Sequence, residues 1–216
     1  MRFKDTREAG RSLAARLGVY AGLEGACVLA SASGGVRVGL EVSKRLRLPL
    51  DLVLLRRLLM ARGAASEPLC VTSVAGARLL DEEAGERAAE DPALGAFLAS
   101  ALAEFDERVR ACRGGRAPLN LKGRAVLHVD NGVRTDSTVR AALRALRRRG
   151  PARVVVAAPV AAPEALASIE EAADDFVYLA APDPFGHVGL WYEDFTRPSD
   201  DEVRSMLEQS EAPQRA

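Results

Sequence analysis

The residues best suited to chemistry lie in one short segment, positions 130–138. The segment reads DNGVRTDST and carries one acid at its start, Asp130, and three hydroxyl side chains, Thr135, Ser137 and Thr138. It stands between an apolar run and a helical pattern, so its backbone N–H groups are expected at the positive end of a helix dipole. Such a loop suits a phosphate group. A carboxylate at the preceding strand end can accept hydrogen bonds from sugar hydroxyl groups, so the segment predicts a sugar-phosphate site.

Two further residues of this segment have predicted conformational roles. Gly132 is expected to adopt a positive φ and so let the chain turn. Asp136 stands at the expected start of the helix, where a carboxylate accepts backbone N–H bonds and contributes about 1 kcal/mol. In that role, Asp136 would occupy the phosphate site from within.

The elements that position this loop are alternating strands and helices. Short apolar runs predict strands, and apolar residues at helical spacing predict helices between them. This alternation favours an α/β fold with a mostly parallel sheet flanked by helices, in which ligands lie beyond the carboxyl ends of the strands. We expect one domain over residues 1–216, with a small hood or flap around residues 56–80 and a C-terminal closing segment at residues 182–209. The predicted strands are 26–30, 50–55, 125–130, 153–160 and 176–180, with a hairpin at 69–74 and 77–80; the predicted helices are 5–17, 91–113, 139–150 and 200–209, and one ending at 46.

The composition excludes several classes of protein. Lys+Arg and Asp+Glu are each 30, so no net charge favours nucleic acid as a partner. The three cysteines form no CxxC pair, which argues against a zinc site or a disulfide framework. No apolar run approaches bilayer length and the first residues carry charges throughout. We therefore expect a cytoplasmic protein without a membrane segment.

The segment VLHVDNGVRTDSTVRAALRALRRRGPARVVVAAPVA resembles the phosphoribosyl-pyrophosphate motif of type I phosphoribosyltransferases, and especially the bacterial predicted phosphoribosyltransferases of about this length. The likeness extends to RFKDTREAGRSLAARL, SGGVRVGLEVSKRLRLPLDLVLLRR and PDPFGHVGLWYEDFTRPSDDEV. It implies Mg²⁺ brought with the substrate and ribosyl transfer to a nucleophile. It places Asp130 and Asn131 as catalytic residues at the ribose hydroxyls, Asp130 at the metal and residues 135–138 at the 5′-phosphate. It also implies that the pyrophosphate loop is Ser33, Gly34 and Gly35.

Several residues depart from the family pattern. Asn131 stands where an acid is usual, which removes a negative charge that would attract Mg²⁺ and stabilise positive charge on the ribose. Asp136 replaces a loop glycine. The arginine usual in the pyrophosphate loop is absent, and Arg37, Arg56 or Arg57 are candidates to replace it. Arg134 stands where purine-specific relatives carry an acidic base, so purine transfer by that route is not supported.

Two interpretations follow from these matches and departures. The first is a phosphoribosyltransferase-like protein that recognises phosphoribosyl pyrophosphate or a nucleotide, with Mg²⁺-assisted ribosyl transfer. The second is a catalytically inactive pseudoenzyme that acts as a regulatory or protein-interaction subunit. With either interpretation, a homo-oligomer or a protein partner is a further expectation. The same scaffold supports both interpretations.

A few other residues have alternative roles. His128, inside a predicted strand, is expected to be a core histidine. His187 is expected to be structural, with a functional role as the alternative because glycines flank it in a loop at the expected active edge. The aromatic residues near the C-terminus are expected to seal the edge of the core, with stacking on a base as the alternative. Two acids next to them are candidates to approach a metal–pyrophosphate group. These aromatic and acidic residues are Trp191, Tyr192, Glu193, Asp194 and Phe195.

Overall fold

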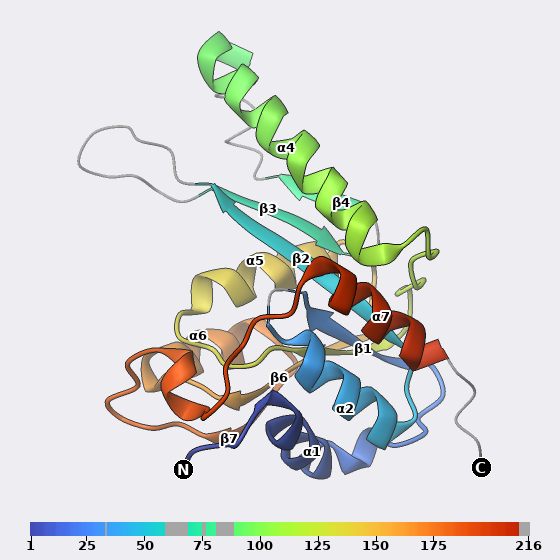
Figure 1. The fold of residues 1–216 in the computed structure, drawn as a ribbon, viewed down its shortest axis with the longest axis vertical. Coiled ribbons are helices and arrows are strands. Elements are labelled where there is room, and N and C mark those ends of the chain that lie inside the picture. The colour runs from blue at the N-terminus through green and yellow to red at the C-terminus, as the bar shows by residue number, and fades with distance from the viewer. Residues whose placement is uncertain (33, 59–68, 75–76, 81–88, 212–216) are drawn as a thin grey trace.

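One seven-stranded sheet forms the centre of the computed structural model, which describes residues 1–32, 34–58, 69–74, 77–80 and 89–211 (Figure 1). The strands lie in the order β4-β3-β2-β1-β5-β6-β7. Strands β2, β1, β5, β6 and β7 pair parallel with their neighbours in this order, whereas β3 pairs antiparallel with both β2 and β4. This pairing confirms the predicted mostly parallel sheet and its hairpin. The strands are β1 (Ala26–Ser31), β2 (Leu50–Leu58), β3 (Leu69–Val74), β4 (Ala77–Leu80), β5 (Ala125–Val129), β6 (Arg153–Val160) and β7 (Asp175–Ala180).

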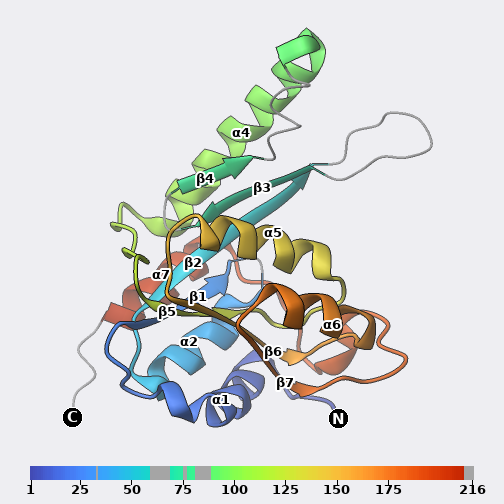
Figure 2. The same cartoon turned by 180° about the vertical axis from the view of Figure 1, so that it is seen from behind.

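Helices cover both faces of this sheet (Figures 1 and 2). Side chains alternate across a strand, so Val28 and Ala30 of β1 join one apolar core while Cys27 and Leu29 join the other. The first core includes α1 (Thr6–Arg16), α2 (Val36–Leu46), α4 (Pro92–Arg113) and α7 (Asp200–Glu211). The second core includes α5 (Asp136–Arg147) and α6 (Pro163–Ala172). No helix among the described residues is long and apolar enough to cross a bilayer.

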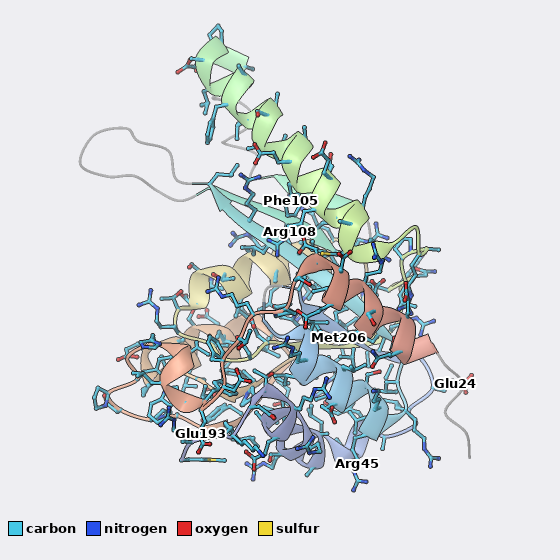
Figure 3. All side chains as sticks on the ribbon, in the orientation of Figure 1. Glu24, Arg45, Phe105, Arg108, Glu193 and Met206 are labelled. Atoms are coloured by element: carbon cyan, nitrogen blue, oxygen red, sulfur yellow. The ribbon has the colours of Figure 1, made fainter. Side chains whose placement is uncertain are left out.

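Helix α4 extends away from the sheet beside β3 and β4, so that these elements form an arm (Figures 1 and 2). Phe105 and Arg108 lie near its inner end, where α4 contacts α7 (Figure 3), and Arg108 pairs with Asp200 at 3.1 Å. The strand predicted at 50–55 continues to Leu58, so Arg56 and Arg57, which were predicted to begin the flap, lie in β2. That extension is supported by antiparallel pairing with β3, a contact that a local pattern cannot reveal. The rest of the predicted flap includes residues 59–68, which lie outside the described residues.

A buried ion pair fixes the inner end of α4 to the sheet. Asp51, in β2, is fully buried, and its carboxylate accepts hydrogen bonds from both terminal nitrogens of Arg113 at 2.6 and 3.2 Å. The same carboxylate accepts the N–H groups of Leu52 and Leu119, each at 2.8 Å. Because its oxygens have four donors, the buried charge is well compensated.

Replacing Arg113 with methionine is expected to lower the free energy of unfolding by about 3–5 kcal/mol, because the Asp51 carboxylate would stay buried without its cation. Arg110→Met on the same helix is the control, since Arg110 is exposed and its loss should change stability by less than about 0.5 kcal/mol. Urea denaturation of both variants measures the difference. Equal stabilities would contradict an anchoring role for the pair.

Candidate functional site

Two loops that are distant in the sequence meet at the carboxyl edge of the sheet. Strands β1 and β5 are parallel neighbours, with Ala30 opposite Val129, so the loops that follow them lie side by side. A Cβ atom added at Gly34 would lie 2.3 Å from the side-chain nitrogen of Asn131, and one added at Gly35 would lie 2.7 Å from the carbonyl oxygen of Val129. Ser33 lies outside the described residues. The structure therefore brings the predicted pyrophosphate loop against the predicted ribose-binding residues.

Asp130 lies half-buried where these loops meet. Its carboxylate accepts a hydrogen bond from the Ser31 hydroxyl at 3.0 Å and another from the Asn131 N–H at 2.7 Å. Desolvation raises the pKa of Asp130 to about 6, and the two hydrogen bonds offset part of that rise. Asp130 is consequently ionised at neutral pH, although desolvation of its carboxylate costs free energy in the folded protein. Carboxylates with such raised pKa values are common at ligand-binding sites.

Gly132 has a different role from the predicted one. Its φ is not positive, so the prediction of a left-handed turn was wrong. A side chain is excluded instead by close packing, because a Cβ atom would lie 2.7 Å from Val188 and 2.9 Å from Val160. The next residue, Val133, is fixed to the end of β6: its N–H donates to Val160 at 2.9 Å and its carbonyl accepts from Ala162 at 2.7 Å. The loop is thus held on the sheet edge by tertiary contacts.

The predicted phosphate-binding residues lie at the N-terminus of α5. Thr135 is the N-cap, and its side chain makes no capping hydrogen bond to the first turn. Its hydroxyl oxygen lies 3.4 Å from that of Ser137. Thr135 and Ser137 are exposed, and Thr138 is half-buried. Three hydroxyl groups therefore lie around the positive end of a helix dipole.

The prediction that Asp136 caps this helix was wrong. Asp136 is the first residue of the helix rather than its cap, so its carboxylate does not reach the N–H groups of the first turn. It accepts a hydrogen bond from the Ser168 hydroxyl of α6 at 2.6 Å and lies 3.7 Å from the Arg140 guanidinium. The start of α5 is therefore not occupied by its own carboxylate.

Two of the three arginines that were candidates to replace the missing arginine of the predicted pyrophosphate loop form ion pairs elsewhere. Arg37 donates to the carbonyl of Thr196 at 2.6 Å and pairs with Glu202 of α7 at 3.1 Å. Arg56 pairs with Glu104 of α4 at 2.8 Å. Arg57 lies in β2, and its side chain is not among the described ones. Arg134 is exposed in the loop before α5.

The histidines and acids outside the two loops fall into separate environments. His128 is buried in β5 with its Nδ1 atom 3.2 Å from the carbonyl oxygen of Leu29, and burial lowers its pKa to about 4, so the prediction of a core histidine is confirmed. His187 is exposed. Asp194 accepts two hydrogen bonds from Thr196 and lines a polar cavity of about 490 Å³ between α1, α2 and α7. The cavity also includes the Arg37 side chain.

Sequence reasoning missed the role of Tyr192. The residue is buried at the edge of the core, as predicted for packing, and its ring stacks on Phe195 with centroids 5.1 Å apart. Its hydroxyl also donates a hydrogen bond to the carbonyl oxygen of Asn131. The signal was the polar group itself, because a buried tyrosine hydroxyl usually has a hydrogen-bond partner. The sequence alone could not name that partner.

Comparisons with known proteins agree with this fold. No protein-family model matches the chain. It is 35% identical to a Mycobacterium tuberculosis (strain H37Rv) protein named "Putative phosphoribosyl transferase", over 96% of this chain and 47% of that protein. It is 37% identical to TT1426 from Thermus thermophilus, whose crystal structure aligns with a TM-score of 0.79 over 97% of this chain and 99% of that one. A Neisseria gonorrhoeae hypothetical protein crystallised with bound ppGpp shares only the fold, at 15% identity and a TM-score of 0.52, over 97% of this chain and 94% of that one.

Three observations define the class of protein. They are the sheet with its covering helices, the meeting of the loops after β1 and β5, and the sequence likeness to a protein named as a putative phosphoribosyl transferase. The chain belongs to the type I phosphoribosyltransferase family, with ligand-binding motifs altered at Asn131 and Asp136. It spans about half the length of the mycobacterial relatives that it matches.

Replacing Gly35 with alanine is expected to lower the free energy of unfolding by about 1–3 kcal/mol, because the new methyl group would meet backbone atoms of Val129 and Asp130 and force the two loops apart. Gly18→Ala is the control, since a Cβ there meets nothing within 4 Å and the backbone needs no positive φ. Thermal unfolding of both variants measures the effect. Equal melting temperatures would show that the loops are not in close contact.

Stability should depend on pH through Asp130. Its pKa is about 6 in the folded protein against an ordinary value of 3.8, so the unfolded chain loses this proton first as pH rises and stability falls between about pH 4 and pH 6. Asp130→Asn should therefore raise the free energy of unfolding at pH 7.5 by about 1–3 kcal/mol and have little effect near pH 4. Asp201→Asn, at an exposed position, is the control. Urea denaturation at both pH values measures this, and a less stable Asp130→Asn protein at pH 7.5 would contradict it.

Proposed function

We propose that the two loops bind the phosphoribosyl group of phosphoribosyl pyrophosphate or of a nucleotide. Asp130 and Asn131 bind ribose hydroxyl groups, residues 135–138 bind the 5′-phosphate, and Gly34 and Gly35 line the pyrophosphate position. The observation that carries this proposal is the contact between Gly34 and the side-chain amide of Asn131. That contact brings a loop suited to an anion and a pair of sugar-binding side chains to one place.

The start of α5 supports the assignment of the 5′-phosphate. The helix has 12 residues, and its first-turn N–H groups and dipole attract an anion. The hydroxyl groups of Thr135, Ser137 and Thr138 add donors. Asp136 supports binding by its orientation, since its carboxylate is turned toward Ser168 of α6. Asp136, which stands in place of the family's loop glycine, is therefore compatible with a bound phosphate.

The residues present fit Mg²⁺ only as an ion that arrives with the substrate. Mg²⁺ is commonly held by one or two carboxylates together with substrate phosphates. Asp130 supplies one carboxylate, and no cluster of three or more acidic, histidine or cysteine side chains that could hold a metal occurs within the described part of the chain. When bound, the ion would neutralise charge on the pyrophosphate. Asp130 would contact it in the proposed site.

The proposed transfer is weakened by Asn131. In ribosyl transfer, the bond between the ribose C1 atom and pyrophosphate breaks, and a nucleophile then bonds to C1, so positive charge develops on the ribose in between. A carboxylate close to the ring stabilises that charge, whereas the neutral amide of Asn131 does so less. We expect ligand binding to survive this change better than catalysis.

A second candidate function is that of a non-catalytic, ligand-binding or regulatory subunit. The observation that favours it is the engagement of Arg37 and Arg56 with Glu202 and Glu104, which leaves neither committed to the pyrophosphate. A measurement of pyrophosphate release from phosphoribosyl pyrophosphate and Mg²⁺, with candidate nucleobases as acceptors, separates the two candidates. Sustained release by the unaltered protein would exclude the non-catalytic candidate.

Calorimetric titration with phosphoribosyl pyrophosphate and Mg²⁺ tests the binding proposal. Asn131→Asp is expected to raise the affinity about fivefold, roughly 1 kcal/mol, because it adds a negative charge next to the metal. Asp136→Gly should have a smaller effect, since its carboxylate is already paired with Ser168 and Arg140. The absence of binding by the unaltered protein at millimolar ligand would reject the proposal.

A further inference from the structure

The C-terminal closing segment carries one side chain into contact with the proposed ribose site. Tyr192 follows the short helix η2 (Val188–Trp191) and is 1% exposed. Its ring packs against those of Phe3 and Phe195, with centroid distances of 5.7 and 5.1 Å. A buried side chain packed against two rings has little freedom to change its rotamer.

The main chain around Tyr192 is fixed as well. The Phe3 N–H donates to the carbonyl of Trp191 at 2.8 Å, and the Glu193 N–H donates to the carbonyl of Phe3 at 2.8 Å. The carbonyl of Tyr192 accepts two hydrogen bonds from the Arg2 guanidinium at 3.2 and 3.1 Å. The tyrosine hydroxyl is therefore held at a defined point by the N-terminal residues of the chain.

That hydroxyl donates to the carbonyl oxygen of Asn131. Burial, and the nearby charge of Asp130, raise the pKa of Tyr192, so its hydroxyl stays protonated and acts as a donor. The peptide between Asn131 and Gly132 is trans and planar, so fixing its carbonyl fixes the orientation of the whole peptide. Val188 packs against Gly132, and Gly34 lies against the side-chain amide of Asn131, so both residues that this peptide joins have close neighbours.

We infer that Tyr192 is a positioning residue of the ribose site: its hydroxyl holds the main chain of Asn131 so that the side chains of Asp130 and Asn131 address the same sugar. The inference rests on the proposed function. It assigns a specific task to the hydroxyl rather than to the ring, because phenylalanine would keep the packing against Phe3 and Phe195 and leave the Asn131 carbonyl without this donor.

The test compares Tyr192→Phe with Ser43→Ala. Ser43 is the matched control, because its buried hydroxyl also donates one hydrogen bond to a backbone carbonyl, that of Leu48, at the far end of α2. The probes are ribose 5-phosphate, 2-deoxyribose 5-phosphate and inorganic phosphate, with dissociation constants measured by calorimetry. Both variants should lose a few degrees of melting temperature. Only Tyr192→Phe should reduce the preference for the ribose over the deoxyribose compound, by about fivefold, while phosphate affinity stays unchanged.

The outcomes separate the inference from the proposed function. If the unaltered protein binds neither sugar phosphate, the proposed function fails and the inference fails with it. If it prefers ribose 5-phosphate and Tyr192→Phe keeps that preference, the inference alone is overturned. An equal loss of preference in Ser43→Ala would also overturn it, because the weaker preference would then result from lower stability rather than from the Tyr192 hydroxyl.

A spectroscopic measurement on the unaltered site tests the role of Tyr192 even if Tyr192→Phe does not fold. The chain has three tyrosines, so 3-fluorotyrosine labelling gives three fluorine signals, and Tyr20→Phe and Tyr178→Phe identify that of Tyr192. Ribose 5-phosphate should shift the Tyr192 signal, and inorganic phosphate should not. An unchanged Tyr192 signal under saturating ribose 5-phosphate would overturn the inference.

Discussion

The close approach of residues 34–35 to residues 129–131 is the constraint on which the site depends. Parallel pairing of β1 with β5 sets the two following loops at one edge of the sheet, and the absence of side chains at Gly34 and Gly35 lets their backbones touch. The Ser31 hydroxyl can then reach the Asp130 carboxylate, and the Asn131 amide lies against Gly34. A larger residue in the first loop would separate the side chains of Asp130 and Asn131 from the backbone of the loop after β1, and with them the two halves of the proposed site.

The site is also shaped by the two ends of the described chain. Phe3 pairs with Tyr192, whose hydroxyl reaches Asn131, while Arg37 joins the first turn of α2 to the carbonyl of Thr196 and to Glu202. Helix α2 begins directly after the proposed pyrophosphate loop. The C-terminal closing segment therefore contacts the surroundings of both loops, so a change within it is expected to alter ligand binding without touching the ligand.

Much of this scaffold could be predicted because its signals are local. Five strands and most of the helices between them follow from the periodicity of apolar residues, although α6 was not predicted. The end of α4 follows from Gly114, which adopts a φ of 58°. The failures depended on partners distant in sequence. A glycine is required at position 132 because Val188 and Val160 pack against it. Asp136 lies one position past the capping site of α5, and its carboxylate accepts a hydrogen bond from Ser168 instead. The Tyr192 hydroxyl shows the same limit, since its partner is 61 residues away.

The central claim is that one phosphoribosyl ligand contacts both loops at once. Backbone amide NMR spectra recorded during titration with phosphoribosyl pyrophosphate and Mg²⁺ test it most directly, because each loop has its own amide signals. The account predicts saturable changes in residues 34–36 and 131–138 together, with one dissociation constant. Changes restricted to the residues around the cavity between α1, α2 and α7, or to only one of the two loops, would contradict it.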